Sequence, residues 1–185
     1  MIAIRAARPE DAAAIAAIYS PYVAGGTVSF ETDPPDTRTM RGRMTASDGL
    51  YPWMVATSGE SDIVLGYAYA TKWRDRPAYK YIVETSIYMA GDRQQQGAGR
   101  LLYDALVDTL VEQDFTQAIA MIALPNDASI TLHESCGFRR GGVFREVGWK
   151  QGRWIDVGLW QRDLADAENP PREPKRFADV GVKRF

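Results

Sequence analysis

The sequence predicts a single α/β domain, built on a mixed and mostly antiparallel central sheet flanked by helices. Strand-like and helix-like patterns alternate along the chain, and its 185 residues fit one domain of ordinary size. Residues 118–124 form an almost wholly apolar run of strand length, which is typical of a strand covered on both faces. Leu102, Leu106 and Leu110 recur at four-residue steps, which indicates a helix with one buried side.

The first part of the chain predicts one strand and two helices. Ile2 and Ile4 alternate with other residues, as in a short strand. Pro9 and the acidic residues after it favour a helix start, because proline fixes φ and acidic side chains suit the positive end of the helix dipole. This helix continues with apolar residues at three- and four-residue spacing until Gly25-Gly26, and a polar helix is expected over about 37–45.

The middle of the chain predicts a hairpin, a further strand and a long helix. Residues 53–56 and 63–73 are expected to form two antiparallel strands joined by a turn at 58–61. Residues 82–89 are rich in β-branched and aromatic residues, which favours another strand. The helix that contains the three leucines follows over about 97–113.

The last part predicts a short helix, two strands and an extended tail. Asn126 or Asp127 can cap a helix that runs through Cys136. Strands are expected at about 143–150 and 155–162, with a turn between them. We predict that residues 1–164 form the domain and that the proline-containing residues 165–185 form an arm, which lies on the surface or on a second subunit, with disorder as the alternative.

Charge, hydropathy and rare residues exclude several classes of protein. The chain has 22 Lys and Arg against 24 Asp and Glu, so its formal charge of −2 argues against a general nucleic-acid binder. Its apolar runs are far shorter than the ~20 residues that cross a bilayer, and its N-terminus does not resemble a signal or transit peptide. One cysteine and one histidine exclude an intrachain disulfide and disfavour a zinc centre. We therefore expect a cytoplasmic protein without metal, nucleic-acid partner or membrane span.

The loop between the strand 82–89 and the helix after it carries the most informative motif. Gln94-x-x-Gly97-x-Gly99 lies where backbone N–H groups at a helix start are free to bind an anion. Glycine lets the chain approach phosphate oxygens without a Cβ collision, and Arg93 and Arg100 add positive charge. Neither the Walker pattern nor G-x-G-x-x-G is complete. Taken alone, the loop fits a phosphate site and an ordinary turn about equally well.

The same loop resembles the acetyl-CoA pyrophosphate loop of the GNAT N-acetyltransferases. The segment from Asn126 through His133-Glu134 to Gly137-Phe138 is similar to the second CoA-contacting helix of that family. Within the family, the chain most resembles the phosphinothricin N-acetyltransferases, over nearly its whole length. The matching pieces, in order, are Thr27-Val28-Ser29-Phe30, Tyr51-Pro52-Trp53, Gly66-Tyr67-Ala68-Tyr69-Ala70, Val83-Glu84-x-Ser86-Ile87-Tyr88, Leu124-Pro125-Asn126-Asp127 and Trp154-x-Asp156-Val157-Gly158-x-Trp160-Gln161.

The resemblance implies the GNAT fold, acetyl-CoA as co-substrate and a homodimer. It implies that Ile87, Tyr88 and Met89 contact the pantetheine arm through their backbone. The residues implied to bind the rest of the cofactor are Gln95, Gln96, Gly97, Ala98, Gly99 and Arg100 at the pyrophosphate, together with Asn126.

Glu84 is a carboxylate in an otherwise apolar strand, and in alternation it shares a face with Ser86 and Tyr88. Partial burial would raise its pKa and suit it to accept a proton from an ammonium, directly or through water. The alternative is a structural carboxylate paired with Lys80 or Arg76. We favour the catalytic interpretation, because the matching glutamate of the phosphinothricin N-acetyltransferases is the proposed general base.

His133 occupies the place where many GNAT enzymes carry a tyrosine general acid, and the phosphinothricin N-acetyltransferases share its His-Glu pair. An imidazolium could protonate a departing thiolate, whose pKa is roughly 8.5, only if its own pKa is not strongly lowered. We name His133 as the second catalytic candidate, and a structural role for it stays open.

The charged aromatic loop 73–79 is expected at the mouth of a cleft. Arginine donors such as Arg76 suit carboxylate, phosphinate or sulfone oxygens. The resemblance implies Phe30, Arg76 and Tyr79 as residues of the acceptor site, whereas we expect Arg74 to be solvated. Trp149, Trp154 and Trp160 are expected in the core, and Cys136 is expected as a small buried side chain rather than an acyl-enzyme nucleophile.

These observations predict an enzyme that moves an acetyl group from acetyl-CoA to the amine of a small acidic amino acid or analogue by direct attack in a ternary complex. Phosphinothricin, methionine sulfoximine and methionine sulfone are the candidate acceptors. One alternative is a GNAT enzyme for another small amine or a peptide N-terminus, although cationic acceptors call for a cleft lined with carboxylates. The other is a non-catalytic acyl-CoA sensor.

Overall fold

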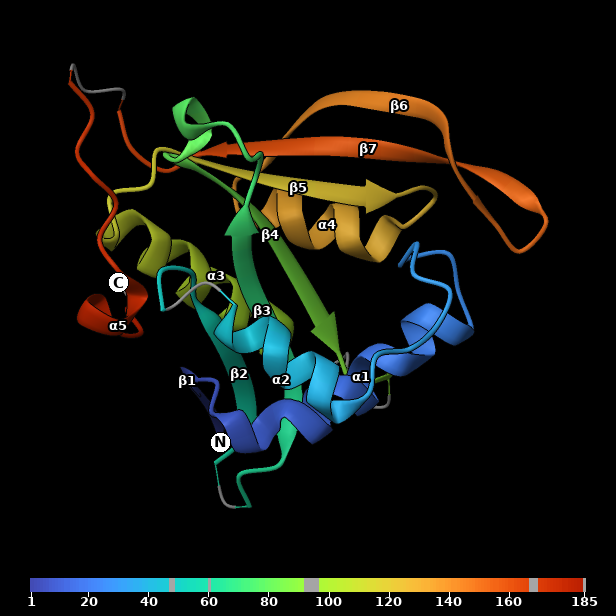
Figure 1. The fold of residues 1–185 in the computed structure, drawn as a ribbon, viewed down its shortest axis with the longest axis horizontal. Helices are drawn as coiled ribbons and strands as arrows, with labels where there is room; N and C mark the ends of the chain where they lie inside the picture. The colour runs from blue at the N-terminus through green and yellow to red at the C-terminus, as the bar shows by residue number, and fades with distance from the viewer. Residues whose placement is uncertain (47–48, 60, 92–96, 167–169, 185) are drawn as a thin grey trace.

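The fold is described from a computed structural model, which covers residues 1–46, 49–59, 61–91, 97–166 and 170–184. In these ranges seven strands form one sheet in the order β1-β2-β3-β4-β5-β7-β6 (Figure 1). Every pair is antiparallel except β4 and β5. The strands are β1 (Ile2–Ala6), β2 (Trp53–Ser58), β3 (Val64–Lys72), β4 (Ile82–Met89), β5 (Gln117–Ala123), β6 (Arg139–Lys150) and β7 (Arg153–Asp163). The predicted mixed, mostly antiparallel sheet is confirmed.

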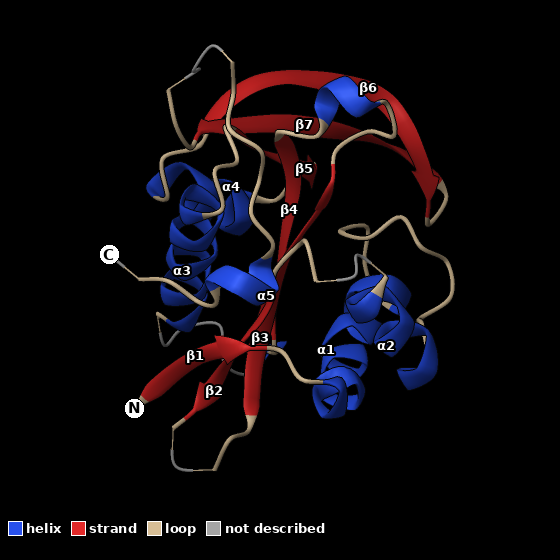
Figure 2. Cartoon of the chain, turned by 60° about the vertical axis from the view of Figure 1, so that its left-hand side comes forward, coloured by secondary structure: helices blue, strands red, loops and turns tan. Residues whose placement is uncertain are grey.

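Helices cover both faces of the sheet (Figure 2). α1 (Ala12–Ala24) and α2 (Thr37–Thr45) lie on one face, and α3 (Ala98–Glu112) and α4 (Asp127–Ser135) lie on the other. Short 3-10 turns at Pro9–Asp11 and Pro77–Tyr79 precede α1 and β4, and α5 (Phe177–Val180) lies near the C-terminus.

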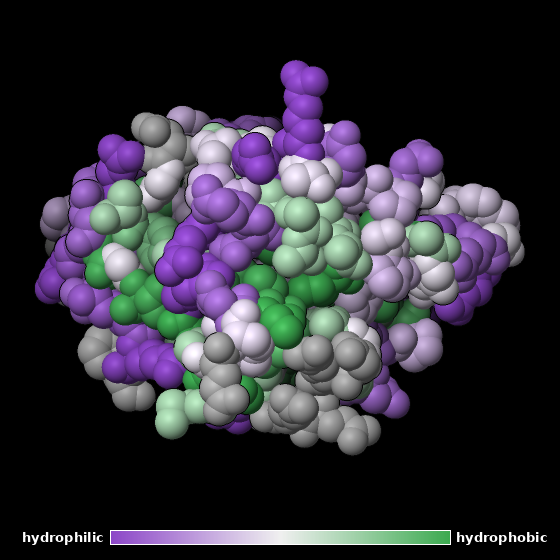
Figure 3. Space-filling model, turned by 90° about the horizontal axis from the view of Figure 1, so that it is seen from below, coloured by the Kyte–Doolittle hydropathy of each residue, from purple (hydrophilic) through white to green (hydrophobic). Residues whose placement is uncertain are grey.

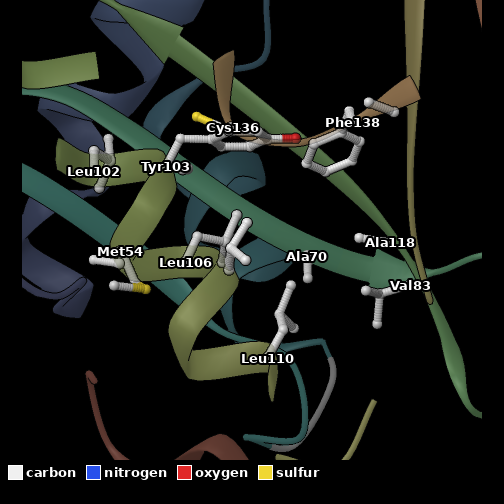
Figure 4. Packing of buried hydrophobic residues seen from close by; sticks show 14 of the residues in the cluster. Met54, Ala70, Val83, Leu102, Tyr103, Leu106, Leu110, Ala118, Cys136 and Phe138 are labelled. Carbon is white, nitrogen blue, oxygen red and sulfur yellow. The ribbon is translucent and has the colours of Figure 1, made fainter. Parts of the chain in front are cut away.

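The larger core lies between the sheet and α3. Leu102, Leu106 and Leu110 are fully buried, as their four-residue spacing predicts. Figure 4 shows this side of α3 against small and apolar side chains of the strands, among them Ala70 and Val83. The small strand residues let the helix approach closely, so the start of α3 is held firmly beside the end of β4.

The second core lies under α1 and α2 and is rich in aromatic rings. The rings of Tyr19 and Tyr22 meet the ring of Tyr88 edge-on, with centroids 4.9 and 5.1 Å apart. Trp53 of β2 stacks on Tyr69 of β3 with ring centroids 4.2 Å apart. Because Tyr88 belongs to β4, this cluster fixes α1 against the strand that carries Glu84.

The described residues of the predicted C-terminal arm pack on their own chain. Phe177 and Val182 lie against the core under α3. The backbone amide of Lys175 donates to the carbonyl of Gln113 at 2.8 Å, and the side-chain amide of Gln113 donates to the carbonyls of Leu50 and Lys175, both at 2.8 Å. This segment therefore joins the end of α3 to the chain before β2.

Two sequence-based expectations about the last strands were wrong. β6 begins at Arg139 rather than near residue 143, because Arg139 still pairs with Gln161 of the long strand β7. Trp160 is buried as expected, but Trp149 and Trp154 are 61% and 56% exposed. These two tryptophans face each other across the β6–β7 hairpin, in the part that extends beyond the end of β5.

The surface of the molecule is mixed in hydropathy on the face that Figure 3 shows. On the face shown in Figure 3, hydrophilic and hydrophobic side chains are interspersed. Within the described residues, none of the helices has both the length and the apolar character that a membrane crossing requires.

Candidate active site

The sheet is split between β4 and β5. The two strands pair only where Ile82–Glu84 meets Gln117–Ile119, and beyond Glu84 they diverge (Figure 1). After this point β4 pairs with β3 alone and β5 with β7 alone among the described strands. The edge of β4 that faces the split therefore has backbone polar groups without a strand partner, which can bind a ligand.

Three neighbouring cavities follow this split from one face of the sheet to the other. One cavity, of about 400 Å³, lies beside the starts of α3 and α4, and we name it the donor cavity after the predicted cofactor residues in its wall. Another, of about 380 Å³, lies on the α1 face and contains Glu84, and we name it the acceptor cavity after the role predicted for Glu84 and Phe30. A narrow cavity of about 50 Å³ lies in the split itself, with His133 in its wall. Val28 borders all three cavities, so two molecules that enter from opposite faces would meet there.

Most of the residues predicted to bind the cofactor line the donor cavity. Six of them line it, namely Ile87, Met89, Gly97, Gly99, Arg100 and Asn126. Gly97 has a φ of 71°, a left-handed conformation that favours glycine, and it places the first turn of α3 at the cavity. Arg100 belongs to this first turn, and its Nε donates to the carboxylate of Asp104, one turn further along α3, at 2.5 Å. A helix start with a nearby arginine suits a phosphate group.

The remaining predicted cofactor residues are placed differently. Ala98 is fully buried, so it can offer only its backbone at the start of α3. The side chain of Tyr88 lies on the acceptor side and in the split. Gln95 and Gln96 lie outside the described residues. Asn126 has a structural function as well, because its Oδ1 accepts a hydrogen bond from the backbone N–H of Ser129 at 3.1 Å and caps α4.

Glu84 lies half-buried in the wall of the acceptor cavity. Burial raises the pKa of its carboxyl, and the charge of Arg74 opposes this shift in part. Within the described residues Glu84 forms no ion pair, and Lys80, one of its expected structural partners, lies 2.6 Å from Glu173 instead. A carboxylate with these surroundings is suited to accept a proton.

A second carboxylate of the acceptor cavity, Glu31, was missed at the sequence level. Arg43 donates two hydrogen bonds to its carboxylate oxygens, at 2.7 and 2.8 Å, and the hydroxyl of Tyr19 donates a third at 2.9 Å. Arg43 is the main cause that lowers the pKa of Glu31. Glu31 is therefore a fixed, ion-paired anion. Glu31 directly follows Phe30, the last residue of the matching segment Thr27-Val28-Ser29-Phe30. This position next to a predicted acceptor residue was the signal in the sequence that could have identified Glu31.

The predicted acceptor residues are only partly brought together. Phe30 lines the acceptor cavity, but Arg76 and Tyr79 do not, and both are exposed around the 3-10 turn before β4. Their sequence distance from Glu84 is short, but the turn directs this segment along the surface. Arg74, which we expected to be solvated, is indeed exposed, yet it is the cation whose charge acts on Glu84.

His133 is almost completely buried, with 3% of its surface exposed. Its Nδ1 lies 2.7 Å from the carbonyl oxygen of Ser129, so this nitrogen carries the proton and donates it to that carbonyl. The ring packs edge-on against Tyr103 and Phe138. Burial lowers the pKa of His133, although the bond to Ser129 opposes this, so the ring is neutral at neutral pH. This environment disfavours an imidazolium acid and favours a structural role, or acceptance of a hydrogen bond at Nε2.

The surroundings of Cys136 agree with the small buried side chain that was expected there. Cys136 is buried, and burial raises the pKa of its thiol to about 11, which does not suit a nucleophile. Among the described residues, the structure contains no group of three or more His, Cys, Asp or Glu that could hold a metal ion.

Known proteins are similar to this chain over most of its length. The family model of the acetyltransferase (GNAT) domain matches residues 4–159. The chain is 38% identical over 179 residues to the phosphinothricin N-acetyltransferase of Streptomyces viridochromogenes, covering 97% of this chain and 96% of that one. It is 33% identical over 169 residues to the L-methionine sulfoximine/L-methionine sulfone acetyltransferase of Pseudomonas aeruginosa, covering 91% and 98%.

A solved structure has the same architecture. The crystal structure of a GNAT phosphinothricin acetyltransferase from Sinorhizobium meliloti, in complex with AcCoA, matches with a TM-score of 0.86 and 34% identity, covering 94% of this chain and 93% of that one. The fold and the resemblance expected from the sequence are confirmed. The family model spans well over half of the chain and the relatives exceed 30% identity along nearly all of it, so the chain belongs to the GNAT acetyltransferase family.

Proposed function

We propose that this enzyme transfers the acetyl group of acetyl-CoA to the primary amine of a small acidic amino acid or analogue, by direct attack within a ternary complex. Glu84 carries the proposal, as a half-buried carboxylate without an ion pair among the described residues, at the point where β4 and β5 part. The names of the relatives support phosphinothricin, methionine sulfoximine and methionine sulfone as acceptors.

The donor cavity suits acetyl-CoA. The N–H groups at the start of α3 and Arg100 would bind the diphosphate, and the unpaired edge of β4 would bind the pantetheine arm. The thioester would then lie at the split, where the small cavity joins the two larger ones.

The acceptor would enter from the α1 face. Glu84 takes a proton from the ammonium group, and the neutral amine attacks the thioester carbonyl carbon to form a tetrahedral intermediate. Collapse of this intermediate breaks the carbon–sulfur bond and gives the amide product and the thiolate of coenzyme A, and the proton that the attacking nitrogen loses protonates this thiolate. Arg74, whose charge acts on Glu84, supports an acidic acceptor, because a carboxylate of the acceptor could pair with this guanidinium while the amine faces Glu84.

A thiol-release assay with acetyl-CoA and a panel of amines tests the function. We expect turnover with phosphinothricin, methionine sulfoximine or methionine sulfone, and at least ~100-fold lower kcat/KM with a polyamine, an aminoglycoside or a peptide N-terminus. Faster turnover with a cationic acceptor would replace the proposed acceptor class. Binding of coenzyme A in calorimetry without turnover of any amine would favour the acyl-CoA sensor.

We also propose that the protein is a cytoplasmic homodimer, in which residues 1–164 form the catalytic domain and 165–185 an arm. Support for the dimer comes from the β6–β7 hairpin, where Phe144, Val147, Trp149 and Trp154 all have exposed side chains. Replacing both tryptophans by lysine should convert the dimer to a monomer in sedimentation equilibrium. A monomeric unmodified protein at micromolar concentration would contradict the proposal.

A further inference from the structure

The segment between α1 and α2 forms one wall of the acceptor cavity. Val28, Ser29, Phe30 and Glu31 all line this cavity, and Val28 alone of the four also borders the donor cavity. The position of this segment therefore determines the shape of the acceptor side much more than that of the donor side.

This wall has little backbone support of its own. Residues 26–35 lie outside helices and strands, and none of them makes a backbone–backbone hydrogen bond to another described residue. Side chains hold the segment instead. The hydroxyls of Tyr19 and Ser29 lie 2.7 Å apart, and the backbone N–H of Glu31 donates to the Ser29 hydroxyl at 3.1 Å.

The strongest tie comes from the far end of the chain. Lys150, the last residue of β6, donates from Nζ to the carbonyl of Val23 at 2.6 Å and to the carbonyl of Ser29 at 2.7 Å. One ammonium thus joins the last turn of α1 to the cavity wall across more than one hundred residues. Figure 1 shows the loop after α1 rising toward the turn of the β6–β7 hairpin.

The same hairpin holds the next residue of the wall. The ring of Phe30 lies directly on Gly148 of β6, where a Cβ would collide with the ring atoms. Two residues of β6 therefore hold the wall. Gly148 leaves room for the ring of Phe30 to pack on the strand, and Lys150 binds the carbonyl of Ser29.

We propose that Lys150 is a positioning residue of the acceptor site, which holds the segment 28–31 in the shape that binds the amine. It touches neither the reacting atoms nor Glu84, and it acts through the two carbonyls that it binds. The inference rests on the proposed function in that the acceptor occupies the cavity of Glu84.

Kinetics of Lys150→Met test the proposal, because methionine keeps the length of the side chain but cannot donate. We expect the KM of the amine to rise about tenfold while the KM of acetyl-CoA stays within about twofold. Lys150→Arg should restore most of the amine KM, since a guanidinium can also donate to two carbonyls. Arg139→Met, which removes an exposed cation from the other end of β6, is the matched control and should leave both constants unchanged.

Gly148→Ala is a second variant that displaces the same segment, because its Cβ would collide with the ring of Phe30. It should raise the amine KM in the same way, and the double variant with Lys150→Met should show less than the product of the two single effects, because both release one wall. An amine KM that Lys150→Met leaves unchanged, or an equal rise in both Michaelis constants, would overturn the proposal.

Hydrogen exchange gives an answer that does not depend on turnover. In Lys150→Met the amides of residues 26–31 should exchange about tenfold faster than in the unmodified protein, and in Arg139→Met they should not. Unchanged exchange in Lys150→Met would overturn the role of Lys150, whatever the result of the acetylation assay. Failure to acetylate any amine in the panel is a separate outcome, which would reject the proposed function. Thermal unfolding of each variant shows whether it is folded under the assay conditions.

Discussion

At the residue scale, the pKa values of the two carboxylates of the acceptor cavity are shifted in opposite directions by their surroundings. Arg43 binds Glu31 with two hydrogen bonds and lowers its pKa, whereas burial raises the pKa of Glu84. A general base must be able to gain and lose a proton near the working pH, and an ion-paired carboxylate resists gaining one. This difference separates the role of Glu84 from that of Glu31.

Glu84→Gln should lower kcat by about 10²–10⁴-fold while the affinity for coenzyme A stays similar. Thermal unfolding at neutral pH should show that the variant is no less stable than the unmodified protein. Because the pKa of Glu84 is raised in the folded state, its contribution to stability is complete below the ordinary glutamate pKa and is lost as the pH rises through the folded value. Unchanged turnover would remove Glu84 from the mechanism, and a clear loss of stability would identify a structural ion-pair partner.

The pH dependence of kcat/KM for the amine should contain a rising limb that belongs to Glu84 and lies above the ordinary glutamate pKa of about 4.3. This limb should disappear in Glu84→Gln, which leaves only the ionisation of the amine itself. His133 lines the narrow cavity and not the acceptor cavity that contains Glu84, so His133→Asn should keep the limb in place. Loss of the limb in His133→Asn, measured on a variant that unfolds cooperatively, would assign the proton acceptor to His133 instead.

At the element scale, the donor edge of β4 depends on its neighbour β3. Gly66 of β3 is paired with Met89, and a Cβ on Gly66 would collide with the Met89 side chain and lie 2.8 Å from the carbonyl oxygen of Tyr88. Met89 also lines the donor cavity, and its carbonyl accepts a hydrogen bond from the hydroxyl of Tyr22 at 2.6 Å. The absence of a side chain at position 66 therefore lets β4 present this edge.

Gly66→Ala should raise the KM of acetyl-CoA by about tenfold, with a smaller effect on the amine, because it displaces the end of β4. Gly42→Ala in α2 is the matched control, since a Cβ there meets nothing within 4 Å. The control should be neutral or slightly stabilising, because alanine favours a helix interior. Initial rates and thermal unfolding of both variants check this, and equal kinetics of the two would show that β4 tolerates the shift.

Elements with a strong local pattern could be predicted from the sequence. The four-residue spacing of the α3 leucines reflects one covered face, and the continuous apolar run of β5 reflects two covered faces, so these local patterns were enough to locate both elements. The exposure of Trp149 could not be predicted, because hydropathy does not tell where a hairpin extends past the strands beside it.

The same limit applies to the site. The two glycines at the start of α3, Gly97 and Gly99, stand out locally, as does Glu84 in β4. The glycines line the donor cavity, and Glu84 lines the acceptor cavity. The bond from Lys150 to Ser29 joins residues 121 positions apart, and no local pattern encodes it. Arg76 was placed in the acceptor site by resemblance, but the 3-10 turn after it keeps it on the surface.

At the scale of the whole molecule, the sheet separates two layers that have their own cores and their own cavities. The core under α3 is mainly aliphatic, and the C-terminal segment closes its base, where the fully buried Gln113 at the end of α3 donates to two carbonyls. The core under α1 is rich in aromatic rings. In the proposed reaction the acetyl group would therefore pass through the split in the sheet, where the narrow cavity lies, rather than over its surface.

The separate cavities proposed for the two substrates have a kinetic consequence. Neither substrate needs to leave before the other can enter, so initial-rate plots at several fixed concentrations of the second substrate should give intersecting lines. Coenzyme A should compete with acetyl-CoA but act as a noncompetitive inhibitor toward the amine, and the acetylated product should show the reverse pattern. Parallel lines would mean that the enzyme itself carries the acetyl group between two half-reactions. The gap between β4 and β5 would then hold only one substrate at a time.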